Sequence, residues 1–123
     1  MILLEHLREQ NILIITPQGP LEEADFQAIA KEVDPAIISK GKVAGLMINM
    51  KSFPGWRNFT AFRAHLRFVA NHQRAIERIA VVTNSRFLKI IPGIAGYFVH
   101  PEIRLFGFEQ KEQALSWLET GRS

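Results

Sequence analysis

Two uninterrupted apolar runs constrain the fold of this chain more than any other feature of its sequence. Residues 43–50 (VAGLMINM) and 78–83 (RIAVVT) each have the length of one strand, and their apolar residues do not alternate with polar ones. Such runs are typical of strands that are buried on both faces, as in a parallel sheet between layers of helices. They therefore predict the centre of an α/β sheet.

Local patterns predict the remaining elements. Further strands are predicted at 2–7, 12–17 and 102–108. The first two should form an antiparallel hairpin, because the four residues between them have turn character. Apolar residues at helical spacing predict helices over 21–40, 58–75, 86–98 and 110–121. We expect Pro35 to kink the first helix or to split it, since proline cannot donate the backbone hydrogen bond.

The order of elements, β-β-α-β-α-β-α-β-α, predicts the topology. Strands that alternate with helices are joined by right-handed crossovers, so we expect a mostly parallel five-stranded sheet with an antiparallel first edge strand. The 123 residues correspond to one domain, 1–123, which is long enough to bury a core. The N-terminal segment does not resemble a signal peptide, and no stretch has the apolar length of a transmembrane helix. We therefore expect a cytoplasmic protein.

The sequence lacks the residue sets of common enzymes. It has no cysteine, which excludes disulfides, thiolate metal sites and cysteine nucleophiles. It has no nucleophile elbow, no phosphate-cradling glycine loop and no dinucleotide-binding motif. His65 and His72 lie two helical turns apart with no carboxylate in the same predicted helix, so they do not predict a metal site. We expect a protein that is not an enzyme and needs no cofactor.

Charge is distributed unevenly along the chain. Residues 40–104 contain eleven Lys or Arg and two Glu, a net charge of +9, whereas the two ends carry four bases and ten acids, a net charge of −6. One interpretation is that the ends fold against the middle and partly cancel its field. The other is a basic surface for an anionic partner. No nucleic-acid-binding module is recognisable, so we do not expect a nucleic-acid partner.

The predicted helix at 58–75 has two apolar faces. We predict that one faces the core through Phe59, Phe62, Leu66 and Val69. The other face consists of Ala61, Ala64, Phe68 and Ala75. Between them lies a basic stripe of Arg63, Arg67 and Arg74. The second face requires a cover, either a neighbouring helix of the same chain or another subunit, and we predict a homodimer that uses it.

The loop KSFPGW (51–56) follows the first apolar run, at the edge where parallel α/β sheets collect ligand groups. A ligand site at this edge would use Ser52, Phe53, Trp56, Arg57, Ser85 and Arg86. Its ligand would be a hydrophobic or anionic small molecule, because aromatic rings stack on apolar groups and free helix N-termini accept anions. The alternative is that Trp56 only caps the core beneath the start of the next helix.

Three segments carry a family resemblance: GWRNFTAFRAHLRFV (55–69), IERIAVVTNSRFLK (76–89) and FVHPEIRLFGFEQKEQALSWL (98–118). With the order of elements, they make the chain resemble the bacterial SpoIIAA-like family. That family is related to the STAS domain of anti-sigma factor antagonists and anion transporters, and distantly to the lipid-binding CRAL-TRIO fold. The resemblance covers nearly the whole chain and implies a SpoIIAA/STAS-like (β/α) superhelix.

The resemblance also points to a serine that is phosphorylated in anti-sigma factor antagonists and lies in a D-S-[ST]-G-like turn after the third strand. Here that stretch reads NMKSFPGW (49–56), which lacks the aspartate and leaves Ser52 as the only hydroxyl of the loop. Ser52 is thus the candidate phosphoacceptor, with Thr60 behind it, but the altered motif does not predict a phosphorylation switch.

These observations predict a non-enzymatic STAS-like regulatory or protein-interaction module with a regulatory protein as partner. The alternative is a protein that binds or carries a hydrophobic or anionic small molecule in a CRAL-TRIO-like pocket. The apolar segment 85–98, with Arg86 and Lys89 beside it, would in that case gate the pocket or contact a membrane peripherally.

Overall fold

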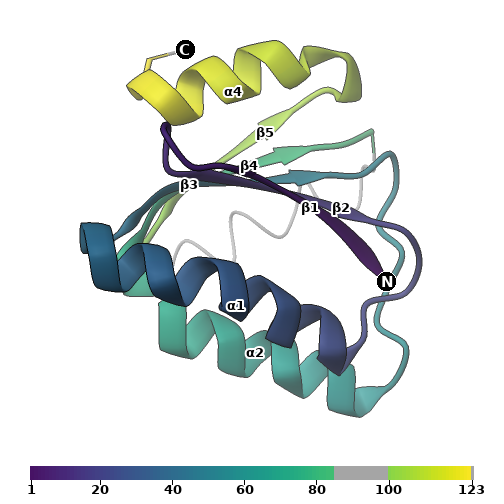
Figure 1. Cartoon of the computed structure of the whole chain (residues 1–123). Helices are drawn as coiled ribbons and strands as arrows, with labels where there is room; N and C mark the ends of the chain where they lie inside the picture. The colour runs from purple at the N-terminus through teal and green to yellow at the C-terminus, as the bar shows by residue number, and fades with distance from the viewer. Residues whose placement is uncertain (85–99, 123) are drawn as a thin grey trace.

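The computed structural model of the chain describes residues 1–84 and 100–122. Its centre is a five-stranded sheet in which the strands follow their order in the sequence (Figure 1). The strands are β1 (Ile2–Leu7), β2 (Ile12–Pro17), β3 (Val43–Asn49), β4 (Ile76–Val82) and β5 (Glu102–Phe106). β1 pairs with β2 in the antiparallel direction and all later pairs are parallel, which confirms the predicted sheet and its antiparallel edge.

Helices cover both faces of the sheet (Figure 1). The helices are α1 (Glu23–Lys40), α2 (Phe59–His72) and α4 (Lys111–Thr120), with short 3-10 turns at η1 (Gln73–Ala75) and η3 (Phe108–Gln110). α1 and α2 lie on one face, and α4 lies on the other. The helix predicted at 86–98 falls outside the described residues.

The core has two halves, one on each side of the sheet, and β2 contributes to both. Leu13 and Ile15 join the half beneath α1 and α2, whereas Ile12 and Ile14 join the half beneath α4. Side chains alternate between the faces of a strand, so a strand between two helical layers must be apolar at every position. On β3, Gly45 lets α4 approach closely, because a Cβ atom there would lie 2.8 Å from Cδ2 of Leu118.

Two expectations about the helices need correction. Of the two alternatives for Pro35, splitting of the helix is wrong, since α1 runs through Pro35 to a left-handed Gly41 cap. Because proline has no backbone N–H, the carbonyl of Lys31 has no helical donor. Both residues are exposed, so water can donate a hydrogen bond to that carbonyl. The second error concerns which face of α2 meets the core.

The face of α2 that was assigned to a partner is the one that packs inside the protein. Ala61 is 0% exposed, and Ala64 and Phe68 pack against the core half beneath α1. Phe59 and Leu66, which were assigned to the core, are 70% and 55% exposed. The reason is that two histidine rings complete the inner face, and small alanines let α2 pack closely on α1.

Candidate functional site

The loop after β3 is fastened to the segment that enters α1. The backbone N–H of Leu21 donates to the carbonyl of Gly55 at 2.8 Å, and the N–H of Arg57 donates to the carbonyl of Leu21 at 2.8 Å. These two bonds form an isolated parallel bridge between Leu21 and Trp56, which fixes the backbone of Trp56 beside the segment that enters α1. Gly55 has a φ of 81°, a left-handed conformation that glycine adopts without strain. The loop therefore presents Trp56 towards α2.

Trp56 is the centre of an aromatic cluster. Its ring lies edge-on to Phe53, with centroids 5.0 Å apart, and to Phe62, with centroids 4.8 Å apart. Its indole N–H donates to Nδ1 of His65 at 3.1 Å, and the His65 ring stacks on Phe26 of α1 at 4.9 Å. The cluster joins the loop, α2 and α1, which supports the interpretation that Trp56 caps the core.

The contact with Trp56 defines the state of His65. An indole nitrogen can only donate, so Nδ1 of His65 accepts and the ring is neutral, with its proton on Nε2. Burial lowers the pKa of His65 below its ordinary value of 6.5, because desolvation penalises the charged ring. If Nδ1 of His65 were protonated, its N–H would face the indole N–H of Trp56, and this hydrogen bond would be lost.

We expect this histidine to make stability depend on pH. Because its pKa is lower in the folded state, the unfolded chain binds more protons below pH 6.5. Its contribution is complete above that pH and is lost as the pH falls through the folded pKa. Urea unfolding at about pH 5 and about pH 7.5 should therefore show a larger loss at low pH for the wild type than for His65→Gln, which still accepts from Trp56 but does not titrate. Equal losses in both proteins would contradict this role.

His72 holds α2 against α1 at the other end of the helix. Its Nε2 lies 2.8 Å from Oδ1 of Asp34, and its Nδ1 lies 2.9 Å from the carbonyl of Phe68. Both neighbours are hydrogen-bond acceptors, so each ring nitrogen lies within reach of one acceptor. The ring also stacks on Phe68 at 4.2 Å. Both histidines singled out in the sequence thus have structural contacts on the inner face.

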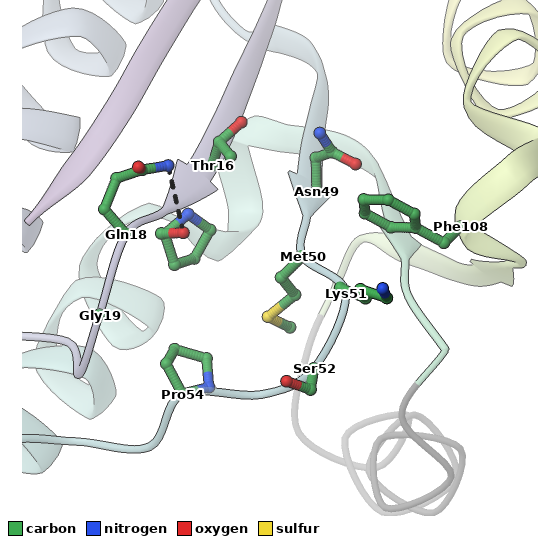
Figure 2. A pocket seen from close by; sticks show the side chains of 10 residues that line it. Thr16, Gln18, Gly19, Asn49, Met50, Lys51, Ser52, Pro54 and Phe108 are labelled. Carbon is green, nitrogen blue, oxygen red and sulfur yellow. Dashed lines mark hydrogen bonds between the residues drawn. The ribbon is translucent and has the colours of Figure 1, made fainter.

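An open cleft of about 330 Å³ lies beside the carboxyl ends of β2 and β3 (Figure 2). Its described lining is Thr16, Pro17, Gln18, Gly19, Asn49, Met50, Lys51, Ser52, Pro54 and Phe108. This is the edge at which α/β folds bind ligands. The cleft is the second element of the candidate site, next to the aromatic cluster.

The structure separates the residues that were predicted to form one ligand site. Ser52 lines the cleft, whereas Phe53 and Trp56 belong to the aromatic cluster. Arg57 forms an exposed ion pair with Glu22, at 2.9 Å between Nε and Oε1. Ser85 and Arg86 lie outside the described residues. The prediction of a site at this edge remains a prediction.

Sequence reasoning overlooked several polar residues of the cleft: Thr16, Gln18, Asn49 and Lys51. The available signal was their position, since each lies at or just beyond the end of β2 or β3. In a parallel pair these ends meet at one edge of the sheet.

The outward face of α2 carries apolar and basic side chains together. Phe59 and Leu66 are exposed, and so are Arg63 and Arg67, which have no ion-pair partner among the described residues. The helix contains no Asp or Glu. This face is therefore both positively charged and partly apolar, which differs from the solvated face of an ordinary surface helix.

Across residues 1–84 and 100–122 the structure shows no cluster of three or more potential metal ligands. Within the same residues, none of the helices combines the length and apolar character needed to cross a membrane.

In the described residues, a sheet in sequence order has two helices on one face and a C-terminal helix on the other, which is an α/β fold of the SpoIIAA-like type. The SpoIIAA-like family model matches residues 12–119, so the chain belongs to the SpoIIAA-like family. This confirms the resemblance. No curated protein matches the chain.

The chain is similar to the crystal structure of an uncharacterized protein with a SpoIIAA-like fold from Shewanella loihica PV-4. The TM-score is 0.73 at 21% sequence identity, over 96% of this chain and 92% of the other. This similarity confirms the fold. Membership of the family indicates a regulatory module of a generally non-catalytic kind, and such domains often interact with proteins.

Proposed function

We propose that this protein is a non-enzymatic regulatory module that binds a partner protein on the outward face of α2, defined by Phe59, Arg63, Leu66 and Arg67. The observation that carries the proposal is the exposure of Phe59 and Leu66, at 70% and 55%. Aromatic side chains and arginine are enriched in protein interfaces, and an exposed leucine beside them adds apolar contact area.

The charge of this face indicates the chemistry of the partner. Arg63 and Arg67 lie beside the exposed apolar residues, and α2 offers no carboxylate to neutralise them. A complementary partner would combine an apolar patch with Asp or Glu side chains. Binding should therefore weaken as salt concentration rises, because exposed charges are screened over roughly 8 Å at physiological ionic strength.

The same charges favour a different protein over a second copy of this chain. In a two-fold symmetric dimer the same surface contacts itself, so the arginines of both copies would meet. Like charges at an interface oppose association. The face of α2 that was predicted to form a homodimer is also not free for this contact, since Ala61 and Phe68 pack within the chain. We therefore assign the outward face of α2 to a partner with acidic side chains.

The alternative function, carriage of a lipid-like molecule, needs an apolar pocket. The described cleft is open and partly polar, with a lysine, two hydroxyls and two amides in its lining. It therefore favours an anionic ligand over a hydrophobic one.

We expect Phe59→Glu to prevent recovery of the partner. The tagged full-length chain would be expressed in its source cells, and bound proteins would be quantified by mass spectrometry after cross-linking. The new carboxylate removes an apolar anchor from the interface, so recovery of the specific partner should fall about tenfold or more. The matched control is Ile38→Glu, the same kind of change at a residue that is 86% exposed on α1.

The cross-linked peptides test the location directly. We expect links between α2 and an acidic segment of the partner, and unchanged recovery with Ile38→Glu. If Phe59→Glu and Ile38→Glu recover the same proteins in the same amounts, the outward face of α2 is not the contact surface.

A further inference from the structure

The cleft at the ends of β2 and β3 has the composition of an anion site. Its described lining includes one ammonium group, from Lys51, and no carboxylate. Thr16 and Ser52 add hydroxyls, and Gln18 and Asn49 add side-chain amides. Figure 2 shows that these groups come from two adjacent strand ends and from the loop that follows β3. All four neutral groups can donate hydrogen bonds to an oxyanion.

The backbone that carries Lys51 and Ser52 is held in place before any ligand binds. The carbonyl of Lys51 accepts from Oγ1 of Thr83 at 3.2 Å and from the N–H of Asn84 at 3.1 Å. The N–H of Met50 donates to the carbonyl of Val82 at 3.0 Å. These three bonds fasten the start of the loop to the end of β4. A preorganised backbone reduces the entropy that binding would otherwise cost.

The polar groups of the cleft are available to a ligand. In the described part of the chain Lys51 has no ion pair, and the side chains of Asn49 and Ser52 have no hydrogen bond. The amide of Gln18 has only a long contact, 3.5 Å, to the carbonyl of Pro17. An ammonium group that lies beside free donors and away from carboxylates attracts negative charge.

The other side of the cleft is apolar, which defines the rest of the ligand. Phe108 is 38% exposed at the rim, and Met50 and Pro54 add further apolar surface. The volume of about 330 Å³ lies at the lower end of the range for small-molecule pockets, roughly 300–1,000 Å³. A ligand of this size has a single small ring or chain beside its charged group.

From these observations we propose that the cleft binds a small soluble organic oxyanion, of the phosphate ester or carboxylate class. Its oxygen atoms lie against Lys51, Asn49 and Ser52, and its carbon part packs against Phe108. This site is separate from the outward face of α2, so it stands or fails independently of the proposed function.

Calorimetric titration of the full chain with phenyl phosphate, at constant ionic strength, tests the proposal. We expect saturable binding with a dissociation constant of about 1 mM or lower, weaker binding of inorganic phosphate, and none detectable for phenol. Lys51→Gln should weaken phenyl phosphate binding about tenfold, because a charge-assisted hydrogen bond is lost. Lys31→Gln, which removes the same charge from an exposed position on α1, should change nothing.

Three further measurements test where the ligand binds and whether it is a soluble molecule or a lipid. Phe108→Ala should weaken binding of phenyl phosphate but not of inorganic phosphate, and amide chemical shifts should change at residues 49–52 and 108. Absence of saturable binding, or equal losses in Lys51→Gln and Lys31→Gln, would overturn the proposal. Binding to vesicles that contain phosphatidic acid without binding to phenyl phosphate would overturn the assignment to a soluble ligand.

Discussion

Phe68→Glu is expected to lower the free energy of unfolding by about 3 kcal/mol, because it removes a packed ring and places a carboxylate in an apolar environment. Phe68 lies 6.4 Å from the Phe26 ring and stacks on His72, and it belongs to the core half beneath α1. Urea unfolding monitored by circular dichroism measures the change. The variant should have a lower midpoint and an unchanged helical content in the absence of urea.

Leu66→Glu is the matched control for this prediction. It introduces the same charge two residues away on the same helix, but on the exposed face. Surface changes of this kind usually alter stability by about 0.5 kcal/mol or less. If the two variants lost equal stability, or if Leu66→Glu were the more damaging, the orientation of α2 described here would be wrong.

The sheet was predictable because its signals are redundant. The apolar run at 43–50 requires cover on both faces, and the helices predicted around it and at the C-terminal end of the chain can supply that cover. Right-handed crossovers then leave few ways of ordering the strands. The strand order of the structure is the simplest of these.

The orientation of α2 was not predictable from apolar residues alone. Its inner face reads Ala61, Ala64, His65, Phe68 and His72, a helical spacing that appears only when the histidines are counted with the core. Histidine has an apolar ring with polar edges, so it can be buried where partners are available. Asp34 lies 38 residues from His72 in the sequence, and Trp56 lies in the loop before α2, nine residues from His65.

The location of the candidate site was predictable, but the residues that line it were not. The rule that ligands bind at strand ends identified the loop after β3. The conformation of that loop then decides which side chains enter the cleft. The bridge between Leu21 and Trp56 turns the tryptophan inward, whereas Ser52 remains at the cleft. Such a bridge joins segments that no local pattern connects.

Thiol labelling of single cysteines tests the central claim, the orientation of α2, most directly. The natural chain has no cysteine, so Ala61→Cys and Leu66→Cys would each provide one reporter without background. A cysteine at the fully buried position 61 reacts only when the helix opens, whereas one at position 66 is exposed in the folded state. After normalisation to the rates in denaturant, we expect Ala61→Cys to be labelled at least about a hundredfold more slowly than Leu66→Cys. Equal rates, or faster labelling at position 61, would contradict it.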